Sequence, residues 1–354
     1  MRRIFVLFMF LILITATVPG SSASAGAGNP RTTTVMSINI YQGTELEHVL
    51  SATDLPSLVA AVSVDYANVR ATNFALRAQA LAGEIAAAQP TLIGLQEVAT
   101  WTVDGTVSYD FLQILLNALA ARGQHYAPVI TRENWGATAP GVVDGAVKLV
   151  SLTEGTALLV RTDLPTDELK WSNPQSHDFT ARTVFPFLGQ PFDLGGGWLS
   201  VDAKVRGKSF RFVTTHMDPI SPLARTAQAA QIVADAGADG LPLVIAGDTN
   251  SDPTSTAYHE FIAGGLTDTW ATLHPDNPGL TCCRIKTGQP DADAISDPNA
   301  PLTERVDYVL TAPGITPLSE TLFNTSPAEM SGGLWPTDHA AITATLGLNP
   351  LPQN

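Results

Sequence analysis

The sequence predicts an α+β fold in a single large domain. Short apolar runs typical of buried strands recur along the chain, and most of them end abruptly in polar residues. Alanine-rich and amphipathic stretches with helical spacing lie between these runs. No linker or charge run divides the 354 residues. We therefore expect one domain over residues 26–354, with loop insertions at 44–70, 131–153 and 274–301.

The first 25 residues have the pattern of a signal peptide. Met1-Arg2-Arg3 precedes the apolar run Ile4 to Val18, and Ala23-Ser24-Ala25 is a small-residue cleavage site. We expect a secreted, extracellular protein whose mature chain starts near Gly26 and has no transmembrane segment. An uncleaved anchor is the alternative, although the run is shorter than the roughly 20 residues that span a bilayer.

The chain is strongly acidic. It has 19 basic and 33 acidic residues, so removing Arg2 and Arg3 with the signal peptide leaves 17 basic residues and a net charge of about −16. A protein that binds nucleic acid stably needs a basic stripe, so we expect no stable nucleic-acid binding. A nuclease that binds transiently through a metal ion stays open. We expect a monomer.

The two cysteines, Cys282 and Cys283, are adjacent. Neighbouring Cα atoms lie about 3.8 Å apart across a trans peptide, which is below the usual disulfide range. A disulfide between them would therefore be strained, although a secreted location permits one. We hypothesise that it forms and stiffens the loop 278–290, and two free thiols are the alternative.

The first half of the domain alternates strands and helices. We expect a strand over 32–40, a helical region over 55–88, a strand over 91–98 and an amphipathic helix over 110–122. Residues 44–70 exceed what a strand-to-helix connection needs, so they are a candidate lid or substrate-contacting insertion. Residues 131–153 are Gly-rich and irregular, and the strand pattern resumes over 155–161.

The second half begins with a hairpin around Arg206-Gly207-Lys208. We expect its strands over 198–205 and 209–215, a helix over 223–238, and strands near 241–248, 305–310 and 340–346. A Pro- and Asp-rich loop over 274–301 separates the last strands from the rest.

Polar residues gather where these apolar runs end. They are Asn39, Glu97, His216, Asp248, Asn250, Asp307, Asp338 and His339. Buried carboxylates repel one another unless a cation or a histidine compensates them. Oxygen ligands without cysteine favour Mg²⁺ or Mn²⁺, and then Ca²⁺. The pattern therefore predicts a metal-centred active site.

Six motifs carry a family resemblance. They are, in order, Met36-Ser37-Ile38-Asn39, Gln96-Glu97-Val98, Thr215-His216-Met217, Gly247-Asp248-Thr249-Asn250, Arg305-Val306-Asp307-Tyr308 and Thr337-Asp338-His339. Together they resemble the endonuclease/exonuclease/phosphatase superfamily of DNase I-like, metal-dependent phosphoesterases, in a secreted bacterial-type form, from about residue 33 to 346. The resemblance implies a four-layer αββα sandwich, in which helices flank two packed, mostly antiparallel sheets. It also implies phosphoester hydrolysis with a divalent metal at one edge of the sheets.

The resemblance assigns the metal ligands and the group that positions the nucleophile. Glu97 matches the principal metal ligand of the family, with Asn39 and Asp338 beside it. Asp248 and Asn250 match the pair that orients the attacking water and contacts a phosphate oxygen. These roles are those that phosphoester hydrolysis needs, because the reaction depends on a positioned nucleophile and on charge stabilisation.

The resemblance also assigns the phosphate contacts and the acid or base. His339 matches the histidine that contacts phosphate or transfers a proton, and Asp307 matches its orienting carboxylate. His216 resembles a second histidine that contacts the substrate phosphate. Arg182 is similar in context to a phosphate-contacting arginine, and a surface salt bridge is its alternative role.

No subtype of the family fits completely. His216-Met217-Asp218 departs from the motif of sphingomyelinases, and the residues before Asp307 lack the Trp and Cys of the 5-phosphatases. We predict a secreted, Mg²⁺-dependent phosphodiesterase that hydrolyses nucleic acid. The alternatives are a phospholipid or inositol-phosphate hydrolase and, from a different class, a non-catalytic binding module on the same fold.

Overall fold

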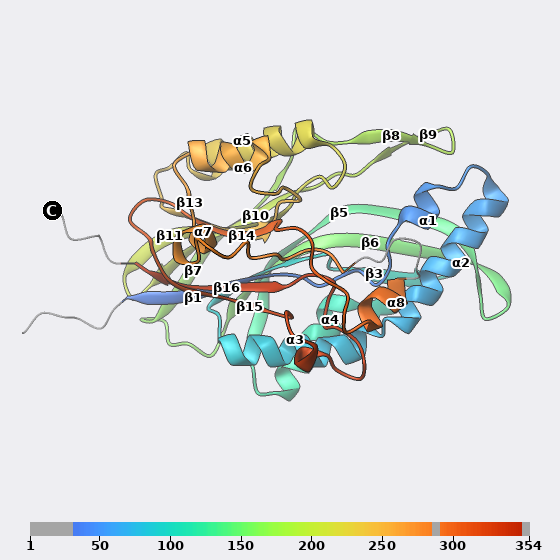
Figure 1. The fold of residues 1–354 in the computed structure, drawn as a ribbon, viewed down its shortest axis with the longest axis horizontal. Coiled ribbons are helices and arrows are strands. Elements are labelled where there is room, and N and C mark those ends of the chain that lie inside the picture. Colours follow the sequence, from blue (N-terminus) through green and yellow to red (C-terminus); the bar gives the residue numbers. More distant parts are fainter. Residues whose placement is uncertain (1–30, 285–290, 349–354) are drawn as a thin grey trace, which may run out of the picture. The chain divides into compact units, whose positions relative to one another are not determined.

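The structure is a computed structural model that describes residues 31–284 and 291–348 (Figure 1). The predicted signal peptide over residues 1–25 therefore lies outside the described residues. Within the described ranges, no helix combines the length and the apolar character that crossing a membrane requires.

Two large sheets form the centre of the fold. The strand order of the first, eight-stranded sheet is β15 (Thr316–Phe323), β16 (Ala341–Gly347), β1 (Thr32–Asn39), β2 (Leu92–Gln96), β6 (Ala146–Arg161), β3 (Thr100–Val103) and β4 (Thr106–Asp110), with β5 (Tyr126–Val143) paired to β6. The order of the second, six-stranded sheet is β13 (Thr267–Asp268), β14 (Asp307–Thr311), β12 (Leu243–Asp248), β11 (Lys208–His216), β10 (Gly197–Val205) and β7 (Leu169–Asp178). A separate two-stranded sheet joins β8 (Val184–Phe187) and β9 (Gln190–Asp193).

Helices cover the outer face of each large sheet (Figure 1). The first sheet packs on α2 (Leu55–Ala71), α3 (Phe74–Ala88) and α4 (Phe111–Ala121), and the second on α5 (Pro222–Ala236) and α6 (Thr256–Ala263). A third apolar core lies between the two sheets. The shorter helices are α1 (Glu47–Leu50), α7 (Thr269–Leu273), α8 (Asp291–Ser296) and the 3₁₀ turn Pro327–Glu329. The predicted four-layer αββα sandwich is confirmed.

Local sequence explains where the helices begin. The region expected to be helical over 55–88 divides at Asn73, which has a positive φ of 40° and caps α3 by accepting a hydrogen bond from the backbone of Leu76. Asp54 begins α2 with a capping box to Ser57. Together α1 and α2 cover most of the predicted insertion 44–70, so this insertion is largely helical.

The prediction that residues 131–153 are irregular is wrong. They belong to the long hairpin of β5 and β6. Asp144 and Gly145 form its tight turn, with φ angles of 52° and 79°. Asp-Gly is a favoured pair for such a turn, because both positions need a positive φ. The turn sets the register of the hairpin, and the two strands stay paired although they contain glycines.

Parallel pairing brings the ends of the central strands together. β1 runs parallel to β2, and β11 runs parallel to β12. The antiparallel strand β14 begins beside the end of β12. The carboxyl ends of four strands and the beginning of a fifth therefore face one region.

The two sheets approach each other closely at Gly94 on β2. A Cβ atom at this position would clash with the Thr214 side chain on β11 and would lie 2.9 Å from the Ala246 carbonyl oxygen on β12. Since backbone and buried side chains occupy this space, the approach of the sheets requires glycine here.

We expect Gly94→Ala to lower the free energy of unfolding by about 1–3 kcal/mol, because overpacking would separate the sheets. Chemical denaturation measures this difference. Gly83→Ala in α3 is the matched control, since its new Cβ would meet only the Arg122 guanidinium at 3.7 Å. The control should stabilise the protein by about 0.5–1 kcal/mol, because alanine is the better helix former. Equal stability of Gly94→Ala and the wild type would contradict close packing at this point.

Candidate active site

Three neighbouring strands of the second sheet present the centre of the site. His216 at the end of β11 is the register partner of Asp248 at the end of β12, and Asp248 is the partner of Asp307 at the start of β14. Asp248 and Asp307 are each 1% exposed. Pairing between strands thus places a histidine and two carboxylates side by side in a buried position.

Asp248 is fixed through both of its oxygens. Its Oδ1 accepts a hydrogen bond from the backbone of Asn250 at 2.9 Å, and its Oδ2 accepts one from Asn39 Nδ2 at 3.0 Å. The same Asn39 nitrogen donates to Glu97 Oε1 at 2.9 Å. The Asn39 amide therefore joins the two sheets by bridging carboxylates at the ends of β2 and β12.

Three residues at these strand ends adopt left-handed backbone conformations. The φ angles are 56° at Tyr41, 54° at Glu97 and 49° at Asn250. Such conformations cost free energy in residues other than glycine, and they persist where the surroundings hold them. At Glu97 the conformation ends β2, and the backbone N–H of Gln42 then donates to Glu97 Oε2 at 2.8 Å.

His339 is paired with a buried carboxylate. Its Nδ1 lies 2.9 Å from Asp307 Oδ2. Burial opposes the charged form of His339, but the charges of Asp307 and Asp338 outweigh this effect and hold its pKa well above the usual value. The pair predicted from the sequence is thus assembled in the structure, with Nε2 as the imidazole atom turned away from Asp307.

His216 has a carboxylate partner that the sequence analysis missed. Its Nδ1 lies 3.2 Å from Oε1 of Glu154, a residue of β6 that is 2% exposed. Asn134 lies at a β-bulge of β5, and its Nδ2 donates to Glu154 Oε2 at 3.0 Å. The first sheet therefore supplies the carboxylate that orients a histidine of the second sheet.

The two histidines converge on one point. His216 Nε2 lies 3.7 Å from Asp248 Oδ2, and His339 Nε2 lies 3.9 Å from the same oxygen. All three residues line a cavity of about 600 Å³. Two carboxylate-paired imidazoles thus line one cavity, each next to the same oxygen of Asp248.

Glu97 and Asp338 offer oxygens for a divalent cation beside this centre. Burial and the charge of Glu97 raise the pKa of Asp338, whereas the charges of His339 and Arg77 lower it, and the net result is a pKa of about 6. Two carboxylates that disfavour each other's charge are stabilised by a bound cation. The donor set fits Mg²⁺. The third predicted ligand, Asn39, has its Oδ1 engaged by the Tyr41 backbone N–H at 3.0 Å.

Two other predicted residues have different surroundings. The side-chain nitrogen of Asn250 donates to the Met217 carbonyl at 3.0 Å, while the residue itself lines the cavity. Arg182 forms an ion pair with Asp193 at 3.4 Å and is not among the residues that line the cavity. The structure thus brings together every predicted site residue except Arg182, whose surroundings are those of the alternative surface salt bridge.

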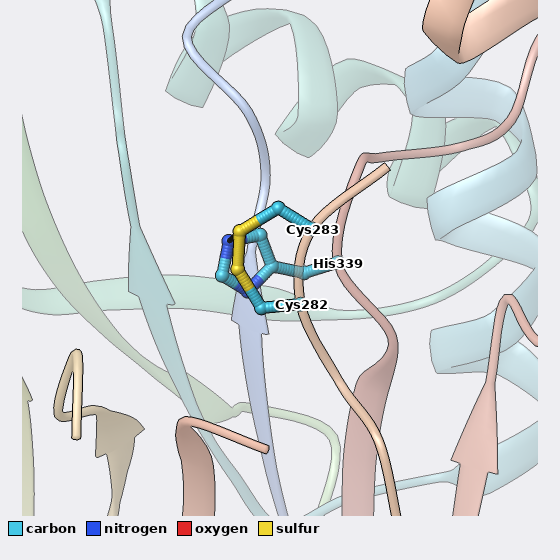
Figure 2. Close-up of side chains that lie close together, drawn as sticks. All are labelled: Cys282, Cys283 and His339. Atoms are coloured by element: carbon cyan, nitrogen blue, oxygen red, sulfur yellow. Dashed lines mark hydrogen bonds between the residues drawn. A yellow bond between two sulfur atoms is a disulfide. The ribbon is translucent and has the colours of Figure 1, made fainter. Parts of the chain in front are cut away.

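The adjacent cysteines form a disulfide, as hypothesised. Figure 2 shows the disulfide lying against the imidazole of His339, with Cys283 Sγ at 3.6 Å from Nε2. Backbone hydrogen bonds join Cys282 to Glu304, and Arg284 to Asp338. The cysteine loop is therefore tied to both segments that carry the His339–Asp307 pair.

We expect the His216–Glu154 pair to stabilise the metal-free protein in a pH-dependent way. Burial lowers the pKa of His216, but the hydrogen bond and charge of Glu154, with the charges of Asp248 and Glu97, raise it to about 10. Because the unfolded value is near 6.5, this stabilisation is complete below that pH and is lost as the pH rises towards 10. Glu154→Gln should weaken this decline, as measured by denaturant unfolding in EDTA.

The matched control for this measurement is Glu133→Gln, which changes an exposed glutamate on the neighbouring strand. It should keep the wild-type dependence of stability on pH. Parallel stability profiles for the wild type and Glu154→Gln would show that Glu154 does not hold the proton on His216.

Comparisons with known proteins identify the family and the fold. The sequence model of the Endonuclease/Exonuclease/phosphatase family matches residues 36–339. The curated proteins give no match. Similar solved structures include two Bacteroides thetaiotaomicron proteins. One is an endonuclease/exonuclease/phosphatase family protein with 19% sequence identity and a TM-score of 0.57, and the match covers 90% of this chain and 98% of that chain. The other is a mannosyl-6-phosphatase with 19% sequence identity and a TM-score of 0.55, and the match covers 89% of this chain and 99% of that chain. The catalytic domain of human nocturnin is also similar, with 18% sequence identity and a TM-score of 0.51, and the match covers 91% of this chain and 94% of that chain. The chain therefore belongs to the endonuclease/exonuclease/phosphatase family of phosphoester hydrolases.

Proposed function

We propose that the chain is a secreted phosphodiesterase that depends on a divalent cation, with Mg²⁺ as the preferred ion. The observation that carries the proposal is the convergence of His216 and His339 on Asp248, next to the carboxylates of Glu97 and Asp338. Family membership supports the reaction class. The sequence alone ranks nucleic acid before phospholipid as the substrate class, and the lining of the cavities, described in the next subsection, argues for the reverse order.

Glu97 and Asp338 would hold the cation, and Asn39 fixes the position of Glu97. When bound, the ion supplies a Lewis acid that stabilises negative charge developing on the phosphate oxygens. The remaining steps depend on side chains of this chain alone.

The two imidazoles bind the phosphate in their protonated forms. Their Nε2 atoms donate to phosphate oxygens, while Glu154 and Asp307 keep the opposite ring nitrogens protonated. Asp248 accepts one proton from the attacking water, whose oxygen forms the new bond to phosphorus. The bond from phosphorus to the leaving oxygen then breaks, and His339 donates a proton to that oxygen. One water molecule is thereby consumed for each ester bond cleaved.

We expect metal-dependent turnover in a panel of plasmid DNA, RNA, sphingomyelin and bis-p-nitrophenyl phosphate, because the site contains the groups for ester hydrolysis but needs a cation. EDTA should abolish the turnover and Mg²⁺ should restore it. Glu97→Ala and His339→Ala should each lower kcat by at least about 10²-fold, the usual cost of losing one group that stabilises the transition state.

Exposed residues of the same types provide the controls for these variants. Glu133→Ala and His259→Ala should leave turnover unchanged, and circular dichroism should show that all four variants are folded. Near-normal rates in both Glu97→Ala and His339→Ala would refute the site assignment. Absence of metal-dependent turnover on every substrate would favour a non-catalytic binding module.

Secretion has separate support. The first 25 residues have the signal-peptide pattern, and the Cys282–Cys283 disulfide suits an oxidising compartment. We expect protein recovered from the culture medium to start near Gly26 and to contain no thiol that reacts with an alkylating reagent before reduction. Intact-mass spectrometry measures both properties. Recovery of the full-length chain from the cell fraction, or labelling of two thiols without reduction, would contradict this part of the proposal.

A further inference from the structure

A second cavity adjoins the catalytic one. It has a volume of about 90 Å³ and is walled almost entirely by apolar side chains from α1, α2, the β5–β6 hairpin and the β8–β9 hairpin. Four of its residues also line the catalytic cavity, and these are Leu46, Leu50, Trp135 and Leu194. These four side chains form a wall that the two cavities share, so the apolar cavity lies directly beside the catalytic one.

Aromatic packing shapes the apolar cavity. Trp135 of β5 meets Phe192 of β9 edge to face, with 5.8 Å between the ring centres. Phe187 of β8 contacts the same Phe192 ring, with 6.4 Å between the centres. In Figure 1 the β8–β9 hairpin extends past α5 towards the side of the molecule where α1 lies. The hairpin thus contributes rings that help to enclose the apolar cavity.

The charges of the catalytic cavity oppose a substrate with many phosphates. Among the described residues that line it there is no lysine or arginine, and six are acidic: Glu45, Glu47, Glu97, Glu154, Asp248 and Asp338. A polynucleotide would bring flanking phosphates towards these carboxylates, whereas nucleic-acid channels are lined by basic groups. A phosphodiester with a single phosphate avoids this repulsion.

Two of the apolar side chains that line the catalytic cavity are exposed to solvent. Leu50 on α1 is 42% exposed, and Ile220 before α5 is 50% exposed, and both line the cavity. An apolar group next to the reacting phosphate would cover these side chains and the wall at Trp135. Removing that surface from water favours binding.

We propose that the apolar cavity binds an alkyl or aryl group esterified to the reacting phosphate. The preferred substrate class is then a phosphodiester of an apolar alcohol rather than a polynucleotide. This inference rests on the proposed phosphodiesterase function. The phosphate lies at His216, His339 and Asp248, and the apolar group extends past Leu50 and Trp135.

A series of p-nitrophenyl phosphodiesters tests the inference, with the second alcohol lengthened from methyl to octyl and every ester kept below its critical micelle concentration. We expect kcat/KM to rise about three- to fourfold for each of the first methylenes, as burial of a methylene group predicts. The gain should appear mainly in KM and should level off once the small cavity is filled. An equal kcat/KM for the methyl and octyl esters would overturn the inference.

A matched pair of variants locates the effect. Ala139→Phe on β5 fills the cavity and should bring the octyl-to-methyl ratio of kcat/KM close to one. Thr138→Phe places the same ring on the opposite face of that strand and should keep the wild-type ratio. Melting temperatures show whether both variants fold. A wild-type ratio in folded Ala139→Phe would overturn the assignment to this cavity.

Two further substrates, phosphatidylcholine vesicles and plasmid DNA, show whether the apolar alcohol belongs to a membrane lipid or to a soluble ester. Higher efficiency on phosphatidylcholine vesicles than on the monomeric octyl ester identifies a membrane lipid, and the reverse identifies a soluble ester; both outcomes support an apolar subsite. Higher efficiency on plasmid DNA than on the octyl ester overturns the inference while the phosphodiesterase function stands. Absence of metal-dependent turnover on every ester instead contradicts the proposed function itself.

Discussion

The burial of charge where the two sheets meet is the constraint on which the site depends. Asp248 and Asp307 are almost inaccessible to water. They are strand partners of each other, and Asp248 is also the strand partner of His216. Ionised carboxylates in such surroundings need hydrogen-bond donors or a positive charge within reach. Two imidazoles and the Asn39 amide meet this need for Asp248 and Asp307. The ion pairs of His216 and His339 are with Glu154, Asp248 and Asp307, whereas Glu97 and Asp338 interact with the two imidazoles only through charge at longer range, and this difference distinguishes the proposed cation site from the phosphate site.

The same constraint explains why much of the fold and of the site could be predicted from the sequence. A short apolar run that ends in a polar residue marks the end of a buried strand, and β1, β2, β11 and β12 all show this pattern. Parallel pairing then places the carboxyl ends of neighbouring strands at one edge of a sheet. Asn39, Glu97, His216 and Asp248 therefore converge even though they are far apart in the sequence. Helices α2, α3, α4 and α5 were predictable for a similar reason, because their apolar spacing and capping residues are local features.

Other parts depend on contacts that local sequence does not reveal. Glu154 lies within a long strand rather than at its end, and it reaches His216, 62 residues away, only because the two sheets pack together. The bulge at Asn134 that holds Glu154 belongs to a hairpin whose glycines resemble those of a loop. Arg182 has its partner in Asp193, at the end of β9, so its role depends on how the small β8–β9 sheet folds back. Strand pairing over long distances decides each of these cases.

The distribution of charge also limits what the cavity accepts. Each histidine that faces the cavity is already paired with a carboxylate, Glu154 or Asp307, so its protonation does not depend on a bound substrate. One phosphate therefore meets two oriented donors and the proposed cation. Glu45 and Glu47 line the same cavity, so in the proposed function they would face a second phosphate further along a polymer. Repulsion at short range in a partly buried site is screened weakly by salt. In the proposed function, the arrangement would thus admit a phosphate without attracting a polyanion, and contact between the apolar wall and the alcohol group would decide which phosphoester binds.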